Sequence, residues 1–364
     1  MKRCLPLSFV LLAEALLLGA CSLLAEAEGV SPPGTLRVVT WNVQALFDGN
    51  QSGTEYSEYF NEAGWGSEKF SARVNGISQA IGRMAGGPPD ILALEEIENL
   101  QCLEALASGE LAKYGYGWTY FAKNRGASLG IGVLSRIPFT EARAHGMVWD
   151  QETAPRPVLE LWLYPEDDPL ALFVCHWKSK LGGDDATETL RRASARIILR
   201  RIREIRSAYP DVPAVIMGDL NENYDEFYRR GGTILSALLP DDPDASDLAG
   251  ADYADLSRGG DFLLLSGEKP PAAANFDPST PVFYSPWEQE LQNGSYYYRN
   301  EWETIDHFLL SEEFFDQRGW DFSSCRVLAQ EPFVSGGGIP DAYNPRTGSG
   351  LSDHLPLMLV LTRH

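Results

Sequence analysis

Positive charge is scarce in this 364-residue sequence. Lysine and arginine total 30 against 51 aspartates and glutamates, so the formal net charge is −21 at pH 7. Proteins that hold long nucleic-acid duplexes without sequence preference gain most of their affinity by neutralising phosphates. The charge balance argues against that class of protein. It leaves open a nuclease that holds a few phosphates beside a bound cation.

Cysteine is also scarce, with five residues in the chain. Three of them, Cys102, Cys175 and Cys325, lie beyond the N-terminal region. This odd number, with no CxxC pair and no cluster of cysteine and histidine, is not typical of a disulfide framework or a zinc site. One disulfide remains open, with no pairing indicated.

The apolar run near the N-terminus is too short to span a membrane. It extends from Leu5 to Leu18 and follows Lys2 and Arg3, which is the layout of an export signal. We therefore assign residues 1–27 to an export signal and residues 28–35 to a spacer.

Two cleavage sites compete within this signal. The sequence LGAC, which ends at Cys21, resembles a bacterial lipobox in which Cys21 becomes lipidated, whereas AEA at 25–27 is an ordinary small-x-small site. A retained hydrophobic helix is a third alternative, although Pro6 and Glu14 would disturb it. We favour the lipoprotein, because a cysteine directly after Gly-Ala at the end of such a run is uncommon by chance.

Beyond the spacer, short apolar runs alternate with helix-period stretches, and several runs are apolar throughout, as in strands covered on both faces. Many strands with few helices favour two packed sheets over one doubly wound sheet. We predict an α/β fold, a four-layer α/β/β/α sandwich of two packed mixed sheets flanked by helices, as a single domain over residues 36–364. A stretch rich in Pro, Gly, Asp and Tyr at 241–299 is predicted to be a long loop. The predicted strands are 36–41, 91–94, 129–134, 158–164, 170–176, 214–217, 305–310 and 357–361, and the predicted helices are 70–84 and 187–206.

Polar residues follow or open many of these strands, where a rigid scaffold can present them at a cleft. Each cluster alone could be a cap, a turn or a solvated pair. Their number and order are what point to a site. They are Trp41-Asn42, Glu95-Glu96, His176-Trp177-Lys178, Asp219-Leu220-Asn221, Asp306-His307 and Ser352-Asp353-His354.

In this order and with these flanks, the clusters resemble the endonuclease/exonuclease/phosphatase superfamily, in particular its deoxyribonuclease-like and bacterial exported nuclease-like members. The resemblance covers about residues 36–361 and rests on WN, DILALEEIEN, GIGVLSR, VIMGDLNEN, ETIDHFLLS and GLSDHLPL. It implies hydrolysis of a phosphoester with the help of a divalent cation.

The resemblance also implies a metal site. Glu96 stands at the acidic position of the family's L-Q-E segment, with Glu95 at the Gln position, and would be the main ligand. Asp353 would help to hold the metal, and Asn42 would support Asp219 or the metal shell. Mg²⁺, with Mn²⁺ as a substitute, is the cofactor this donor set implies, since hard cations prefer oxygen ligands.

The remaining site residues take catalytic roles by the same resemblance. His354 would contact the scissile phosphate or act as general base, oriented by Asp306. Asp219 and Asn221 would position the water or the leaving group, and would point the same way if the strand stays extended. His176 would donate to a phosphate or leaving oxygen.

The sequence departs from the family pattern at three places. The Glu partner that orients the first His in pancreatic-type enzymes cannot be assigned here. Gln44 replaces a carboxylate that many relatives carry two positions after the Asn, so a second direct ligand there is in doubt. The Trp-Cys-Asp-Arg signature of inositol-polyphosphate phosphatases is absent around Asp306.

Basic residues offer candidate phosphate contacts. Arg156 stands where several relatives place a phosphate-contacting arginine, with a surface or ion-paired arginine as the alternative. Lys178 follows His176 closely enough to meet a phosphate. Seven arginines between 191 and 206 are interpreted as an ion-paired helix surface, with Arg191 or Arg192, near the loop, as the exception.

We therefore expect an exported nuclease that acts on DNA or RNA, either anchored in the membrane through Cys21 or free in the periplasm or outside the cell. A sphingomyelinase-like or sugar-phosphate hydrolase is the alternative, with an aromatic stretch around Phe283, Trp287 and 296–298 as its candidate membrane contact. A catalytically silent surface binding protein is a further alternative. We expect a monomer without a protein partner.

Overall fold

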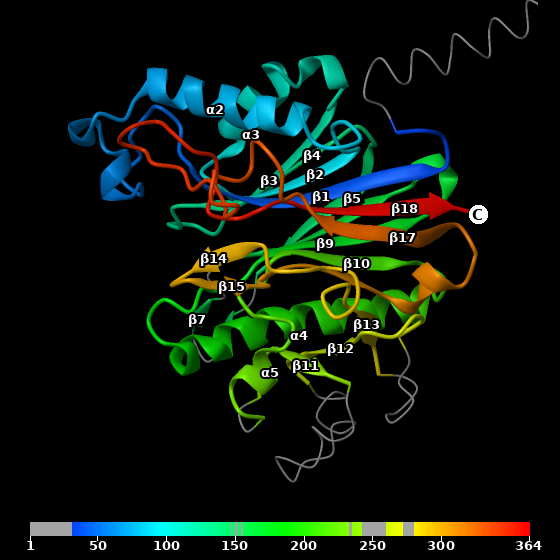
Figure 1. Ribbon diagram of the computed structural model, residues 1–364. Coiled ribbons are helices and arrows are strands. Elements are labelled where there is room, and N and C mark those ends of the chain that lie inside the picture. Colours follow the sequence, from blue (N-terminus) through cyan, green and yellow to red (C-terminus); the bar gives the residue numbers. More distant parts are fainter. Residues whose placement is uncertain are drawn as a thin grey trace, which may run out of the picture.

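The computed structural model describes residues 31–146, 148–149, 152–153, 156–232, 235–241, 260–271 and 280–364. Two large sheets lie face to face, with α2 and α3 outside the first sheet and α4 and α5 outside the second (Figure 1). The predicted four-layer sandwich of mixed sheets is confirmed. The export signal and Cys21 lie outside the described residues.

The two sheets hold most of the described strands. The first has the order β17 (Trp320–Val327), β18 (Leu357–Arg363), β1 (Thr35–Leu46), β2 (Ile91–Ile97), β4 (Gly130–Ser135) and β3 (Trp118–Ala122). The second has the order β11 (Leu238–Pro240), β12 (Leu263–Ser266), β13 (Val282–Tyr284), β16 (Asp306–Leu310), β10 (Ala214–Asp219), β9 (Leu170–His176), β8 (Val158–Leu163) and β5 (Phe139–His145). Two small hairpins pair β14 (Tyr296–Tyr298) with β15 (Glu301–Glu303) and β6 (Val148–Trp149) with β7 (Glu152–Thr153).

The helices are α2 (Ser67–Gly82), α3 (Leu100–Ser108), α4 (Asp184–Ala208) and α5 (Glu226–Arg229). The helices predicted at 70–84 and 187–206 correspond to α2 and α4, and every predicted strand is present. The sequence analysis missed α3, whose Asn99 side chain accepts a hydrogen bond from the Cys102 N–H and so caps the helix. None of the described helices has the length and apolarity that crossing a membrane requires.

Strand alternation divides the core into layers. In β1, Val38 faces the second sheet, whereas Val39 and Trp41 face α2 and α3. In β10, Val215 and Met217 face the first sheet, whereas Ala214 and Ile216 pack under α4. Because successive side chains of a strand point to opposite faces, the even-numbered and odd-numbered residues of any one strand enter different layers.

The prediction of a long loop at 241–299 is wrong for part of that range. Leu263–Ser266 and Val282–Tyr284 are buried strands that extend the second sheet in parallel from β11, and Tyr296–Tyr298 forms a hairpin strand. These runs have three or four residues each, too short to stand out among the prolines and glycines around them.

Most arginines of α4 are paired with carboxylates, as the ion-paired helix surface predicted. The exception made for Arg191 and Arg192 is wrong. Arg191 is fully buried and bonds Glu188 and Glu222, each at 2.7 Å, and Arg192 bonds Asp261 at 2.6 Å.

The three described cysteines, Cys102, Cys175 and Cys325, are buried free thiols, so no disulfide joins them.

Candidate active site

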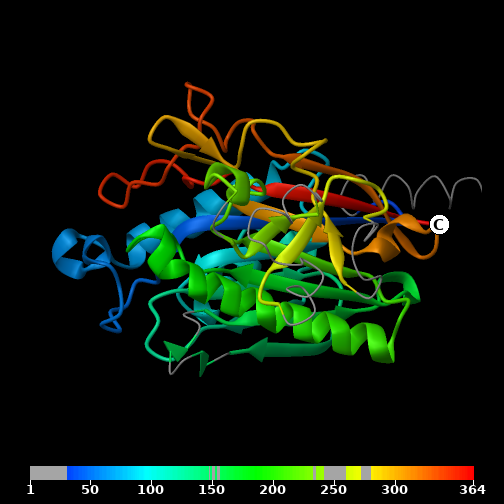
Figure 2. The ribbon, with the colours of Figure 1, turned by 90° about the horizontal axis from the view of Figure 1, so that it is seen from below.

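The polar side chains at the strand ends continue the inner-face alternation of the core. Asn42, Glu95, His176, Asp219 and Asp306 have the parity of the residues that pack between the two sheets. Strand pairing places Asn42 opposite Glu95, and Asp219 opposite both His176 and Asp306. The apolar layer between the sheets therefore ends, at one edge, in a cluster of polar groups. This edge is the one that carries the β14–β15 hairpin and the loop at 334–350 (Figure 2).

Glu95 and Glu96 differ in direction because of a β-bulge. Glu95 is fully buried between the sheets and accepts a hydrogen bond from Thr40 Oγ1 at 2.8 Å. At Glu96 the backbone has φ 64°, and the pairing of β2 with both neighbouring strands shifts register there. The bulge redirects the Glu96 carboxylate, which accepts from the Ala45 N–H at 2.8 Å and lies 3.9 Å from His176 Nε2.

The Asp219 carboxylate contacts three other residues of the cluster. Its Oδ2 accepts from Asn42 Nδ2 at 3.0 Å and lies 3.3 Å from His176 Nε2, and its Oδ1 accepts from the Asn221 N–H at 2.9 Å. Burial would raise the pKa of Asp219, but the hydrogen bond from His176, together with the charge of His354 and the hydrogen bond from Asn42, holds this pKa below its usual range. Asp219 is therefore an ionised carboxylate that contacts several donors.

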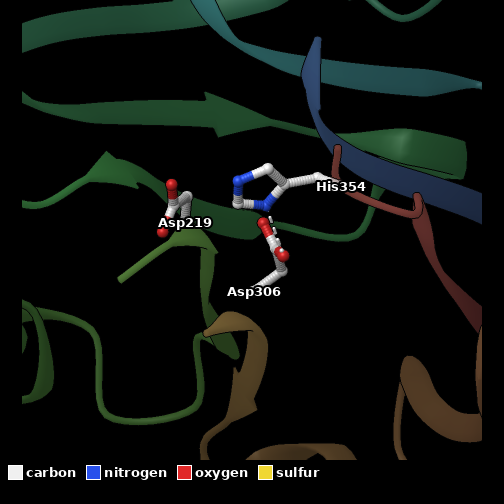
Figure 3. Close-up of side chains that lie close together, drawn as sticks. All are labelled: Asp219, Asp306 and His354. Carbon is white, nitrogen blue, oxygen red and sulfur yellow. Dashed lines mark hydrogen bonds and ion pairs between the residues drawn. The ribbon is translucent and has the colours of Figure 1, made fainter. Parts of the chain in front are cut away.

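The Asp306 and His354 side chains meet although the two residues lie far apart in the sequence. His354 Nδ1 is 2.9 Å from Asp306 Oδ2, and Asp219 lies on the other side of the imidazole (Figure 3). Ser295 Oγ donates to the same Asp306 oxygen at 2.5 Å. Burial alone would lower the pKa of His354, but Asp306, by charge and by hydrogen bond, holds it well above the usual value. His354 is thus set up to carry a proton.

His176 has the opposite protonation state. Burial, together with the nearby charge of Arg156, lowers its pKa below the usual histidine value. Because Asp219 is ionised, a neutral His176 places its Nε2–H toward that carboxylate. The site therefore holds one charged and one neutral histidine around one aspartate.

Glu96 and Asp353 are the residues that fit a divalent cation. Burial raises the pKa of Asp353 to about 6, and the carboxylates of Glu96 and Asp219 contribute to this rise. Carboxylates that disfavour each other's ionisation are relieved by a cation between them, and their oxygens suit Mg²⁺. Within the described residues, Asp219, Asp306 and His354 also lie close enough to share an ion, with ligand atoms within 4.8 Å of one another. However, Asp306 Oδ2 and His354 Nδ1 already bond each other, which leaves that group less suited to a cation.

Two polar side chains serve neighbouring loops. Asn221 has φ 53°, so the strand alternation ends at Asp219, and Asn221 Nδ2 donates to the Trp177 carbonyl at 3.1 Å. The expectation that Asn221 points with Asp219 required an extended strand, which is not present there. Gln44 Oε1 accepts from the N–H groups of Tyr343 at 2.7 Å and Asp353 at 3.1 Å, so this residue fixes the loop that carries Asp353.

The two predicted phosphate contacts are placed differently. Arg156 Nη1 donates to the Trp177 carbonyl at 2.5 Å, and its charge acts on His176, so it lies at the site. The Lys178 ammonium instead bonds oxygens of its own loop, including the Leu181 carbonyl at 3.0 Å. The structure does not direct Lys178 into the cluster.

The sequence analysis missed the residues that cover His354. The Tyr296 ring lies 4.5 Å from the His354 ring, centroid to centroid, and Tyr298 stacks beyond Tyr296 at 6.0 Å. Asp353 and Asp219 are among the charges that raise the pKa of Tyr296, after burial, so its hydroxyl lies near the carboxylates. Tyrosines at 296 and 298 have the spacing of one strand face, but nothing in the sequence connects them to a histidine near residue 350.

Comparison with protein families gives one match by sequence. The profile described as the Endonuclease/Exonuclease/phosphatase family matches residues 37–242. No curated protein matches the chain.

Comparison with solved structures gives matches that cover most of the chain. A humanized D. rerio TDP2 with 14 mutations has 15% identity and a TM-score of 0.52, and the match covers 90% of this chain and 99% of that one. D. rerio TDP2 complexed with single strand DNA product has the same identity, coverage and TM-score. Truncated Caenorhabditis elegans TDP2 has 13% identity and a TM-score of 0.51, with coverage of 90% and 97%. At this identity the likeness shows the fold alone.

Proposed function

The chain belongs to the Endonuclease/Exonuclease/phosphatase family, and from this premise we propose that it is a divalent-metal-dependent phosphodiesterase, most specifically a nuclease that acts on DNA or RNA. The observation that carries the proposal is the hydrogen bond between His354 Nδ1 and Asp306 Oδ2, which are 2.9 Å apart, with Asp219 beside them. The Glu96 carboxylate lies at the same edge of the sheets. These groups come from four separate segments of the chain. Their convergence has no role in packing the apolar core.

The proposed reaction uses groups whose protonation states differ. Ionised Asp219, bonded to Asn42, is the acceptor for the proton of the attacking water. Protonated His354, held by Asp306, donates from Nε2 to a non-bridging phosphate oxygen, where negative charge grows in the transition state. Neutral His176 and Arg156 stand on the other side of Asp219 and contact the phosphate or the leaving oxygen. When bound at Glu96 and Asp353, Mg²⁺ or Mn²⁺ would supply charge neutralisation of the phosphate.

A nucleic-acid substrate is supported by the aromatic rings beside His354. Tyr296 and Tyr298 stand nearly parallel, at 19°, and Tyr298 is 46% exposed, so a base next to the scissile phosphate has an aromatic ring to stack on. The fold is that of a protein solved with a single strand DNA product. The chain's net charge of −21 favours short or single-stranded nucleic acid over long duplexes.

The lipid alternative has weaker support. Phe283 and Trp287, two candidates for membrane contact, are buried, with 0% and 4% exposure. The hairpin that holds Tyr298 also carries exposed Arg299 and Glu301, which do not suit an apolar interface. A catalytically silent protein would be expected to have lost a residue of the cluster, and none of the predicted site residues is missing.

A substrate screen tests the proposal. Purified protein is incubated with plasmid DNA, RNA, sphingomyelin and inositol phosphates, with Mg²⁺ or with EDTA, beside the matched variant His354→Ala. We expect nucleic-acid hydrolysis that requires Mg²⁺ and is lost in His354→Ala. Hydrolysis of sphingomyelin alone would replace the nuclease by the lipid alternative. Absence of any hydrolysis would favour the binding protein.

We also propose that the protein is exported and anchored through Cys21. If Cys21 is lipidated, Cys21→Ser moves the protein from the membrane fraction to the soluble fraction, because stable attachment depends on the acyl chains. An unchanged distribution in a fractionation experiment would favour cleavage after Ala27 or a retained helix.

A further inference from the structure

Three arginines gather on the outer face of the first sheet, the face directed away from the catalytic cluster. Arg37 lies in β1 and Arg326 in β17, and Arg136 follows β4. Arg37 and the Arg136 side chain are each 9% exposed, whereas Arg326 is exposed at the surface. Three positive charges this close together repel one another, and an anionic partner would stabilise them. The chain as a whole has 51 acidic residues.

One carboxylate, Asp90, lies among these arginines. Its Oδ2 accepts from the backbone N–H of Arg37 at 2.9 Å and from Ser31 Oγ, and its Oδ1 is 3.6 Å from Arg136 Nη1. Burial lowers the pKa of Arg37, Asp90 opposes this, and the charges of Arg136 and Arg326 add to the lowering. Two positive charges and one negative charge thus act on the Arg37 guanidinium.

The Arg37 guanidinium has a buried donor to spare. Among the described residues, Arg37 Nη1 has no hydrogen-bond partner. A buried charged donor without an acceptor costs free energy, and most such groups in proteins have a partner.

A glycine lies beside this donor. A Cβ at Gly86 would lie 3.5 Å from Arg37 Nη1 and 3.7 Å from Arg326 Nη2, so two guanidinium nitrogens point to one place. Gly86 has φ 87°, a conformation that other residues rarely adopt. Arg326 Nη2 also donates to the Ala85 carbonyl at 2.8 Å, which fixes the exposed side chain at this place.

We propose that the cluster of Arg37, Arg136 and Arg326 binds a phosphate group, carried by a phospholipid headgroup or free in solution. Guanidinium groups offer planar pairs of N–H donors that match phosphate oxygens, and a dianion balances the excess positive charge. The site is separate from the proposed catalytic one and does not depend on its activity.

The position of the cluster bears on the two sources of phosphate. Ser31, which bonds Asp90, is where the described chain begins, and ten positions separate it from Cys21. A lipid anchor at Cys21 would bring the cluster near membrane headgroups, so the headgroup source rests on the proposed anchor. The free-phosphate source does not.

Calorimetric titration of the full chain with inorganic phosphate in EDTA tests the site. We expect Arg326→Gln to weaken phosphate binding about tenfold or more, since it removes a charge-assisted hydrogen bond. Arg37→Gln should do the same. Arg200→Gln, an exposed charge change on α4, and Arg156→Gln, beside the catalytic cluster, are the matched controls and should leave this binding event in place.

Vesicle sedimentation distinguishes the sources. Binding to phosphatidylcholine vesicles that requires added phosphatidylglycerol, and that falls in Arg326→Gln, assigns the headgroup. Phosphate binding without vesicle binding assigns free phosphate. Phosphate binding unchanged in Arg326→Gln, or lost only in Arg156→Gln, overturns the proposal, as does the absence of both kinds of binding. If Arg37→Gln fails to fold, the exposed Arg326→Gln still decides the outcome.

Discussion

Helix α4 and the catalytic cluster are both rich in charge, but the charges are arranged in opposite ways. On α4, Arg201 bonds the buried Glu160 at 2.7 Å, and Arg191 bonds Glu188 and Glu222 at the same distance. At the sheet edge, burial and the nearby Glu96 carboxylate instead raise the pKa of Asp353. A buried charge that is paired makes the fold sensitive to loss of its partner, whereas like charges held close together at a sheet edge indicate a ligand. The number of charged residues in a segment therefore says less about function than their pairing.

The largest effect is expected at the Asp306–His354 pair. Asp306→Asn removes the carboxylate that holds and charges His354, so turnover should fall about 10³- to 10⁴-fold. His354→Ala should be at least as damaging. Because both residues serve one function, the double variant should be scarcely slower than His354→Ala. Steady-state kinetics with a nucleic-acid substrate measures this cycle, and multiplicative losses would mean that the two residues act independently.

Breaking the paired charges of α4 should affect stability more than chemistry. Arg191→Met leaves Glu222 buried without its cation and leaves Glu188 with Arg230 alone, at 3.2 Å, and we expect the free energy of unfolding to fall by about 3–5 kcal/mol. Arg200→Met, which removes an exposed arginine 4.0 Å from Glu204, should change it by less than about 0.5 kcal/mol. Urea unfolding compares the two. Equal losses would show that burial of the pair does not matter.

A smaller effect, on the pH dependence of stability, is expected at His307, whose pKa is shifted in the opposite direction to that of His354. Burial lowers the pKa of His307 to about 4, and its Nε2 bonds the Glu222 carbonyl at 2.8 Å, so this histidine is neutral. The unfolded chain binds a proton at this histidine below about pH 6.5, whereas the folded chain binds it only below about pH 4. The free energy of unfolding should therefore decrease by up to about 3 kcal/mol between these pH values and then level off.

The variant His307→Gln isolates this contribution. It keeps a side-chain N–H for the Glu222 carbonyl but does not titrate, so its acid-dependent loss of stability should be shallower than that of the natural chain. Urea unfolding at several pH values gives the difference, in which the other titrating groups cancel. Identical pH profiles would contradict a buried neutral His307.

The parts of the site that the sequence predicts are those that follow strand periodicity. His176 and Asp219 end strands, Asp306 begins one and Asn42 lies within β1, all with the parity of the inner face, so alternation places them between the sheets. Glu96 breaks this rule, because only the bulge at φ 64° redirects it. Family resemblance, and not periodicity, identified Glu96 over Glu95.

Other features depend on contacts that no local pattern encodes. Ser295 and Tyr296 reach the Asp306–His354 pair through a hairpin whose strands have three residues each. Arg191 resembles its neighbours in the arginine run, but it is the arginine that bonds Glu222, a residue of the segment between β10 and α5. Lys178 lies near His176 in sequence, yet its ammonium bonds the following loop. Such outcomes are set by tertiary packing.

The central claim is that the carboxylates of Glu96 and Asp353 at the sheet edge hold a divalent cation. Titration with Mn²⁺, followed by electron paramagnetic resonance, tests it without relying on activity. We expect one site, weakened at least about tenfold in Glu96→Gln, because the amide keeps the shape but loses the charge that a hard cation requires. Glu204→Gln, which removes an ion-paired carboxylate on α4, should bind Mn²⁺ as the natural chain does. Equal Mn²⁺ affinity in Glu96→Gln and Glu204→Gln would contradict the account.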